Sequence, residues 1–339
     1  MGKKVKKIIF FVLIIIFILI ILTGGFIYVF IRNKMNKINY EQLNFEDLSI
    51  NENILEEINS NEEISLNESE LKQIKTIAIF GSDSRNVQDS YDDARSDVII
   101  IFSVNQITKK ISMISIPRDT YVNIDGHGKT KINHAFAYGK EQLAIKTINQ
   151  NFGLNISEYI TVNWESVAKL VNMVGGIDLY ISDAEKNFIN SAIGYTAENS
   201  NGNSTKLKSA GMVRLNGTQA LTHCRNRKVG NDFKRAERQR NVITKLLEKI
   251  SQKDLNEINT LIDNFLPYVK TNIDIMEYSS YIPEALKYKT EYLSNIVSTQ
   301  VPSTSEAQGQ MINGVYFFVP NSYEVCKQTF IEYLYGDKK

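Results

Sequence analysis

Arginine is the residue type whose placement says most about the chemistry this sequence can perform. Lysine and arginine together number 39 in the 339-residue chain, but only ten are arginines, and nine of those ten fall within residues 85–118 and 214–240. A guanidinium group is planar, permanently charged and able to pair two N–H groups with phosphate or carboxylate oxygens. The clustering therefore predicts an anion-binding site built from two distant stretches, with surface charge or structural ion pairs as the alternative.

The first stretch carries carboxylates close to its arginines. They lie where short apolar runs begin or end: Asp83 near Arg85, Asp97 near Arg95, and Asp119 beside Arg118. Because α/β sheets bind ligands where strands end, we expect these side chains at one rim of a sheet. Carboxylates in such a cluster either hold guanidinium groups as ion-pair partners or bind Mg²⁺ that shares phosphate oxygens. The residue types leave both roles open.

The second stretch groups polar side chains around the start of an expected helix: Arg225, Arg227, Asp232, Arg235, Arg238 and Gln239. If residues 220–227 form a strand, its two arginines share a face because side chains alternate. In the helix that follows, the other two arginines lie one turn apart. Asp232 is a candidate N-cap of that helix, and the free N–H groups at a helix start favour phosphate.

The elements that must position these residues are those of an α/β domain. Short runs rich in Ile and Val predict buried strands at 74–80, 98–104 and 111–116. Apolar spacing predicts helices at 135–149, 164–173 and 234–250. The Asn, Ser and Gly content of residues 184–210 predicts a long surface loop. The C-terminal part carries no recognisable motif and is expected to complete the same domain, with helical segments at 254–264 and 281–295, a flexible 302–310 and a strand at 314–319.

The N-terminus predicts where the chain resides. Four lysines in residues 1–7 precede a charge-free run over 8–31, which is long enough to span a bilayer and is followed by no clear cleavage pattern. We therefore expect an uncleaved signal anchor, with a cytoplasmic tail over 1–7 and the rest of the chain outside the cell; a buried core helix is the alternative. Residues 32–73, with ten acidic and no basic side chains over 41–70, predict a solvated spacer or an acidic partner-binding arm.

Other features are less informative. The two cysteines, Cys224 and Cys326, allow one disulfide bond or two buried thiols. The three histidines have no metal-ligand spacing. The formal net charge of +1 hides a strong segregation of charge, because residues 206–240 hold ten Lys and Arg against two acidic residues, and it therefore says little about partners.

Eight short motifs follow one another between residues 74 and 250. They are Gly81-Ser82-Asp83, Arg95-Ser96-Asp97, Ser115-Ile116-Pro117-Arg118-Asp119, Lys131-Ile132-Asn133-His134-Ala135, Val174-Gly175-Gly176-Ile177-Asp178, Leu215-Asn216-Gly217-Thr218-Gln219-Ala220-Leu221, Arg225-x-Arg227 and Asp232-x-x-Arg235-x-x-Arg238-Gln239. In these motifs, their order and the N-terminal anchor, the chain resembles the LytR-CpsA-Psr family of envelope glycopolymer transferases. Each motif alone is a weak signal, whereas eight in order are a specific one.

The resemblance implies a three-layer α/β/α domain, over residues 74–339, outside the membrane. Such a domain binds a polyprenyl diphosphate lipid with Mg²⁺ and moves its glycopolymer, such as teichoic acid or capsular polysaccharide, onto a peptidoglycan hydroxyl. The matching motifs assign Asp83 and Asp97 to the metal. The catalytic set would be Arg95, Arg118, Arg225, Arg227 and Asp232, and further head-group contacts would come from Arg85, Arg235, Arg238 and Gln239.

Two points stay open at this stage. The general base for the acceptor hydroxyl is either Asp232 or Asp119, and Asp119 suits an ion pair with an arginine better than a base. The same site would also serve a hydrolase that cleaves the lipid diphosphate with water, and a membrane-bound regulator or glycopolymer-binding protein needs no catalysis at all. Release of polyprenyl phosphate only in the presence of peptidoglycan would separate these functions. Nucleic acid is not an expected partner, because the basic cluster lies outside the membrane.

Overall fold

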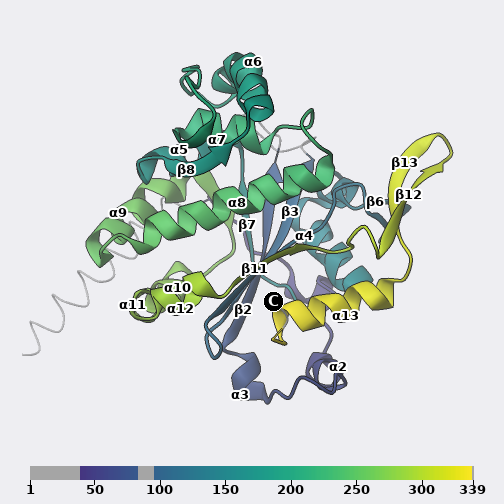
Figure 1. Cartoon of the computed structure of the whole chain (residues 1–339). Coiled ribbons are helices and arrows are strands. Elements are labelled where there is room, and N and C mark those ends of the chain that lie inside the picture. Colours follow the sequence, from purple (N-terminus) through teal and green to yellow (C-terminus); the bar gives the residue numbers. More distant parts are fainter. Residues whose placement is uncertain (1–38, 83–94, 338–339) are drawn as a thin grey trace, which may run out of the picture. The chain divides into compact units, whose positions relative to one another are not determined.

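The computed structural model describes residues 39–82 and 95–337. At their centre is a seven-stranded mixed sheet in the order β1-β10-β7-β2-β3-β4-β11 (Figure 1). Its strands are β1 (Asn39–Tyr40), β2 (Ile74–Ser82), β3 (Ser96–Asn105), β4 (Lys110–Ser115), β7 (Tyr159–Val162), β10 (Val269–Thr271) and β11 (Ile296–Gln300). The three strands predicted from the Ile and Val runs are confirmed as β2, β3 and β4.

Both faces of the sheet are covered, which explains why β3 is an almost unbroken apolar run. On one face, Ile99 and Ile101 join the main core with Phe136 and Phe330, from α4 (Asn133–Phe152) and α13 (Tyr323–Leu334). On the other face, Ile100 belongs to a second core with side chains of α8 (Asp232–Ser251) and α12 (Lys289–Ser294). Figure 1 shows α8 lying across the strands. The sheet therefore lies between two helical layers.

A further core extends the α8 layer. It joins α8 to five elements: α5 (Trp164–Met173), α6 (Asp183–Asn199), α7 (Gly217–Cys224), α9 (Leu255–Phe265) and the hairpin of β8 (Ile177–Ile181) with β9 (Gly211–Leu215). The prediction of a loop over 184–210 was wrong for its first half, which is α6. A capping box between Ser182 and Glu185 starts this helix, and Ile189 and Ile193 bury one of its faces.

The acidic N-terminal segment differs from the predicted solvated spacer. From residue 39 onward it packs on the domain through η1 (Phe45–Asp47), α2 (Ile54–Asn59) and α3 (Glu68–Leu71). Ile54 and Ile58 are buried against Ile331 of α13. In α2 the two isoleucines face inward while Glu56 stays exposed, and residues 39–73 belong to the folded unit.

The remaining elements complete the same unit. They are the hairpin β5 (Tyr121–Ile124) with β6 (Gly128–Lys131), the hairpin β12 (Ala307–Ile312) with β13 (Val315–Pro320), η2 (Leu266–Tyr268), α10 (Ile275–Ser280) and α11 (Ile282–Lys287). The predicted helices are confirmed as α4, α5, α8 and α9, and the segment 281–295 forms two short helices. The predicted strand at 314–319 is β13, and β12 covers the end of the expected flexible segment.

The two cysteines form no disulfide bond, and both thiols are buried. Within residues 39–82 and 95–337, no helix is both long enough and apolar enough to span a bilayer. The predicted tail and anchor, over 1–7 and 8–31, lie outside the described residues.

Candidate active site

The antiparallel pairing of β2, β3 and β4 brings Asp97 and Arg118 of the first stretch to one edge of the sheet. The end of β2 lies beside the start of β3, where Ser82 pairs with Ser96, and the end of β4 lies on the other side of β3. Asp97 stands at the start of β3, and Arg118 follows β4. Asp83 and Arg85 follow β2 in the sequence but lie outside the described residues.

Asp97 is the acidic centre of the site. Its Oδ1 accepts a hydrogen bond from Nη1 of Arg118 at 2.6 Å, and its Oδ2 accepts one from Nη2 of Arg227 at 2.8 Å. Its backbone carbonyl accepts a 3.4 Å bond from Arg235. Burial by itself raises the pKa of the Asp97 carboxyl, but the charges of Arg118 and Arg227 outweigh it and hold that pKa below its usual range. An ionised Asp97 thus gathers three arginines around one point.

Two of these arginines keep N–H groups available. Nε of Arg118 and Nε of Arg235 are buried and have no hydrogen-bond partner among the described residues. Asp119 lies 3.6 Å from Nε of Arg118, and Asp232 lies 3.3 Å from Nη1 of Arg235. Burial lowers the pKa of Arg235, and the neighbouring charge of Arg227 adds to that effect. A buried, incompletely compensated guanidinium favours binding of a further anion.

The loop between α7 and α8 carries Arg225 and Arg227. The predicted strand over 220–227 was wrong, because α7 ends at Cys224 and Arg225 is its C-cap. The two arginines therefore point to different partners. Arg227 reaches Asp97, whereas Nη1 of Arg225 donates to Oγ1 of Thr196 at 3.2 Å and its guanidinium lies 5.3 Å from the ring of Tyr195.

Arg238 holds this loop in place. Its Nε donates to Oε1 of Glu185 at 2.7 Å, its Nη1 donates to the carbonyl of Asn226 at 3.1 Å, and its Nη2 donates to the carbonyl of Val229. The side chain is buried and is absent from the described residues that line the two cavities discussed below. The structure therefore places Arg238 behind the loop that carries Arg227, and its predicted head-group contact stays a prediction.

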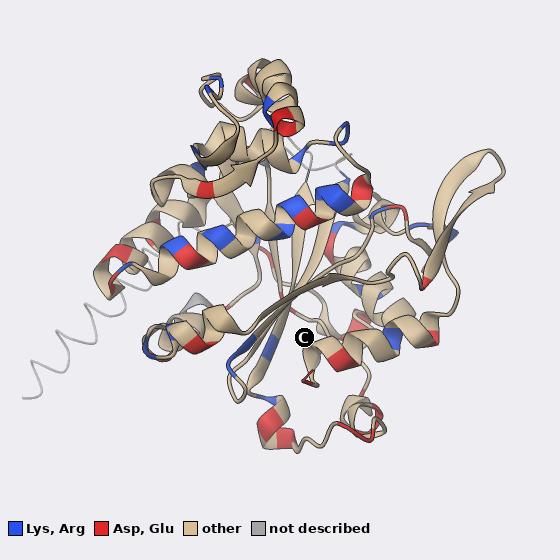
Figure 2. Ribbon diagram, viewed as in Figure 1, with Lys and Arg blue, Asp and Glu red and all other residues tan. Residues whose placement is uncertain are grey.

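The start of α8 supplies the other polar groups, and Figure 2 marks several positions of basic residues along this helix in blue. Its N-cap is Asn231, whose side chain accepts a hydrogen bond from the backbone N–H of Lys234. The N-cap role expected for Asp232 was therefore wrong. Its carboxylate, half-exposed, pairs with Arg235. Gln239, one turn after Arg235 in α8, lines both cavities described below.

Arg95 lies apart from this group. It is exposed just before β3. Burial of His134 lowers the pKa of that imidazole, and the charge of Arg95 lowers it further. His134 in turn is bonded to Oγ1 of Thr130 at 2.9 Å. The structure therefore brings together Asp97, Arg118, Arg227, Asp232, Arg235 and Gln239, with Arg225 close by. It places Arg95 beside α4.

A large apolar cavity opens beside Asp97. Its volume is about 750 Å³, and it runs between one face of the sheet and helix α8. Alternate residues of β2, β3 and β7 line one side, among them Ile79, Ile100 and Phe102, and Ile243 and Leu247 of α8 line the other. The polar residues at its mouth include Asp97, Arg225, Arg227, Arg235 and Gln239. A strongly charged anion site thus opens directly onto an apolar space.

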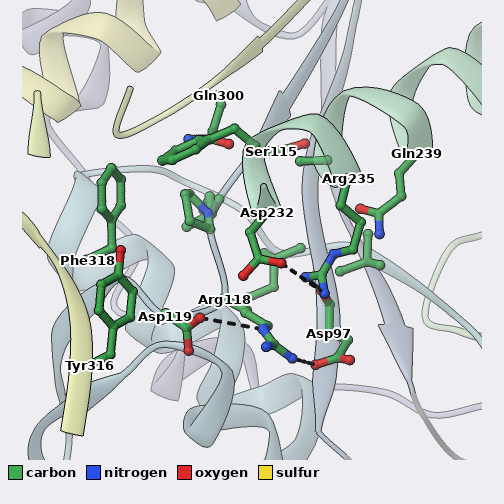
Figure 3. Close-up of a pocket in the computed structure, with 16 residues that line it drawn as sticks. Asp97, Ser115, Arg118, Asp119, Asp232, Arg235, Gln239, Gln300, Tyr316 and Phe318 are labelled. Carbon is green, nitrogen blue, oxygen red and sulfur yellow. Dashed lines mark hydrogen bonds and ion pairs between the residues drawn. The ribbon is translucent and has the colours of Figure 1, made fainter. Parts of the chain in front are cut away.

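A second, smaller cavity adjoins the large one (Figure 3). It has a volume of about 60 Å³ and shares Asp97, Val98, Arg235 and Gln239 with the large cavity. Its other polar lining residues are Ser115, Arg118, Asp119, Asp232 and Gln300, and Tyr316 and Phe318 of β13 close one side. In Figure 3 Asp119 lies to the left of Arg118, Asp232 lies above it, and Asp97 lies to its right.

Several of these functional residues escaped sequence reasoning. The apolar lining of the large cavity is indistinguishable from ordinary core, because a strand that faces a cavity and one that faces a packed helix have the same composition. Gln300, Tyr316 and Phe318 stand in the C-terminal part, where no motif marks them. Tyr195 lies in the segment expected to be a loop.

The fold and the site define a mixed α/β domain in which a carboxylate-centred arginine cluster guards an apolar cavity. A model of the LytR_cpsA_psr family matches residues 39–330, so this chain belongs to that family. The expectation drawn from the eight motifs is confirmed.

Named relatives and solved structures are similar over most of the chain. A "Polyisoprenyl-teichoic acid--peptidoglycan teichoic acid transferase TagU" of Oceanobacillus iheyensis is 30% identical, over 75% of this chain and 73% of its own. The protein of the same name from Bacillus subtilis is 28% identical, over 93% and 92% of the two chains. Among solved structures, "TagT bound to LI-WTA" has a TM-score of 0.60 and 25% identity, covering 81% of this chain and 96% of that one.

Proposed function

We propose that this protein transfers a glycopolymer, of the teichoic acid or capsular type, from a polyprenyl diphosphate carrier to peptidoglycan. The observation that carries the proposal is the opening of the arginine cluster around Asp97 onto the apolar cavity of about 750 Å³. A ligand that satisfies both halves has a diphosphate joined to a long hydrocarbon chain. The names of the relatives support the same substrate class.

The cavity would hold the polyprenyl tail. Its lining of Ile, Val, Leu and Phe side chains offers no charge to the lipid, and burial of hydrocarbon is favourable by about 25 cal/mol per Å². Tyr195 and Arg225 stand where the lining becomes polar. The tail would therefore fix the diphosphate at the arginines, which is the positioning that phosphoryl transfer needs.

The arginines would hold the diphosphate and stabilise charge as it moves. Nε of Arg118 and Nε of Arg235 are the buried donors already in place, and Arg227 and Arg225 approach from the loop before α8. Because Asp97 compensates only part of this charge, the cluster stays attractive to phosphate. Donors fixed in advance cost little reorganisation when the bond to the leaving polyprenyl phosphate breaks.

Asp232 is the general base that we propose for the acceptor hydroxyl. It does not cap α8, its side chain is half-exposed, and it lines the small cavity beside Arg235. Asp119 lines the same cavity, but its carboxylate pairs with Lys131 at 2.7 Å. That ion pair leaves Asp232 as the better placed acceptor for a proton.

Mg²⁺ is the metal that we propose for the site. Among the described residues, no group of three or more His, Cys, Asp or Glu side chains is placed to hold a metal ion. Mg²⁺ needs only one or two carboxylates, because it keeps several waters and takes oxygens from a phosphate. Asp97 fits this role, since each carboxylate oxygen accepts one hydrogen bond and retains a further lone pair. Asp83 would be the second ligand, and the bound ion would neutralise charge on the diphosphate.

The charge-free run over residues 8–31 would anchor the chain with its N-terminus in the cytoplasm. The folded unit would then work outside the membrane, within reach of lipid-linked donors. Protease added to intact cells stripped of their wall should digest the folded unit. Complete protection of the protein would contradict this topology.

The test of function uses the full-length chain in detergent, a lipid-linked teichoic acid precursor and Mg²⁺. We expect release of polyprenyl phosphate, with the polymer joined to peptidoglycan, only when peptidoglycan is added. Equal release without peptidoglycan would show a hydrolase. Binding of the lipid with no release under either condition would show a binding protein.

A further inference from the structure

The large apolar cavity and the small cavity adjoin each other, because they share four lining residues. The shared residues are Asp97, Val98, Arg235 and Gln239. If the proposed function holds, the leaving polyprenyl phosphate occupies the large apolar side. In phosphoryl transfer the attacking and leaving oxygens are roughly in line, so the acceptor hydroxyl needs an approach to the phosphorus that the lipid does not occupy. The small cavity adjoins the large one at these residues and offers such an approach.

The hairpin of β12 and β13 is fixed against this small cavity. The backbone N–H of Phe318 donates to the carbonyl of Asp119 at 2.9 Å. The ring of Phe318 meets Phe233 of α8 edge-on, with centroids 5.3 Å apart, and Phe317 meets Tyr121 at 4.9 Å. Figure 3 shows Tyr316 and Phe318 side by side along one wall of the cavity. The hairpin is therefore part of the site, although the chain contributes it from its C-terminal part.

Tyr316 presents an aromatic surface at this place. Its ring packs over Gly309 on the neighbouring strand, where an added Cβ would come 2.8 Å from the tyrosine Cε2 and Oη. The side chain is nevertheless 47% exposed, and Met311, directly opposite in the hairpin register, is 66% exposed. A glycine that leaves room for a flat ring holds that ring in one orientation. An exposed, oriented ring beside polar groups is suited to packing against the apolar face of a sugar.

We infer that Tyr316 and Gln300 form the acceptor subsite and bind a pyranose of the peptidoglycan glycan chain. The sugar ring packs on Tyr316, Gln300 hydrogen-bonds a hydroxyl, and the attacking hydroxyl points to Asp232. Its oxygen bonds to the phosphorus that bears the glycopolymer, and its proton passes to the Asp232 carboxylate. The bond from that phosphorus to the bridging oxygen breaks, and the electron pair leaves with polyprenyl phosphate. This inference rests on the proposed function, which it extends to the acceptor.

Binding of the acceptor is measured without turnover. The probe is a peptidoglycan-derived tetrasaccharide without peptide, titrated by saturation-transfer NMR into the full-length chain in detergent. Tyr316→Ala should weaken its binding roughly tenfold, and Tyr316→Phe should restore most of it because the ring remains. The matched control is Tyr180→Ala, which removes a 70% exposed tyrosine from β8, away from both cavities. Unchanged affinity in Tyr316→Ala would overturn the inference.

Kinetics separate this inference from the proposed function. In the transfer assay, Tyr316→Ala should raise the KM for the tetrasaccharide and leave the affinity for the lipid donor unchanged. A loss of donor affinity, or weaker binding to anionic phospholipid vesicles in place of the tetrasaccharide, would show that the hairpin serves the lipid or the membrane, and would overturn the inference. Absence of transfer by the wild-type chain would contradict the proposed function alone, because the NMR titration still reports on the sugar subsite.

Discussion

Arg227 donates a 2.8 Å hydrogen bond to Asp97 although 130 residues separate them in the chain. This bond closes the site, because it joins the loop before α8 to the edge of the sheet. The residue types left open whether Asp97 holds guanidinium groups or binds a metal, and this bond shows that it holds a guanidinium group. A role at the metal would be additional to that one.

Asp97→Asn tests the metal role. The amide keeps the shape of the side chain but loses its charge, so we expect the variant to fold and to lose the Mg²⁺-dependent part of its stabilisation by polyprenyl diphosphate. Thermal shift with and without Mg²⁺ measures this, and Asp83→Asn should behave alike. An unchanged Mg²⁺ effect in both variants would remove these residues from the metal site.

Arg227→Lys and Arg225→Lys test whether the guanidinium geometry matters. Lysine keeps the charge but loses the planar pair of donors, so lipid affinity should partly remain while turnover falls roughly 10- to 150-fold. Arg214→Lys is the control, because Arg214 also binds a carboxylate, with two hydrogen bonds to Asp178 at 2.9 and 3.0 Å, but lies outside both cavity linings. Turnover close to that of the wild type in both site variants would exclude the clamp.

Arg238→Lys should lower the stability of the protein as well as its turnover, unlike the variants of Arg225 and Arg227. The substitution loosens the loop through the contacts with Glu185 and the carbonyl of Asn226, so the melting temperature and turnover should fall together. Circular dichroism melting and steady-state kinetics measure the two effects. A loss of turnover with unchanged melting would instead place Arg238 on the substrate.

Leu247→Trp should shorten the lipid that the protein accepts. The larger side chain fills part of the apolar cavity, so long polyprenyl diphosphates should bind more weakly while short ones keep their affinity. Ile107→Trp, at the exposed turn after β3, controls for the added indole. Equal losses for long and short chains would mean that the tail lies elsewhere.

Because the imidazole of His223 is buried, we expect the folded protein to lose stability in mild acid. Burial holds the pKa of its imidazole below the ordinary value of 6.5, and Arg238 opposes protonation further, whereas Glu185 favours it. The unfolded chain therefore takes up a proton that the folded chain refuses, so stability is complete above pH 6.5 and falls as the pH drops below it. The melting temperature of wild type should fall more steeply between pH 7 and 5 than that of His223→Gln. Parallel curves would contradict this origin.

Local patterns account for much of the fold. The Ile and Val runs of β2, β3 and β4 and the apolar spacing of α4, α5 and α8 are properties of short segments, and the structure confirms them. Two of the wrong predictions concern helix starts, where one adjacent residue decides which side chain caps the helix. Asn231 caps α8 one residue before Asp232. The capping box of Ser182 and Glu185 starts α6 where a loop was predicted. Such competition between adjacent residues is too fine for composition to resolve.

The site divides in the same way. Residue type and motif order alone determined the family and an anion site of arginines and carboxylates, because charge and donor geometry belong to each side chain wherever it lies. Only the tertiary structure decided which arginine does what. Long-range packing placed Arg227 on Asp97 and Arg238 behind the loop. It also formed the apolar cavity between sheet and helix and brought Tyr316 of the C-terminal hairpin to the small cavity that Asp232 lines. These relationships depend on contacts between segments far apart in the chain, and no local pattern encodes them.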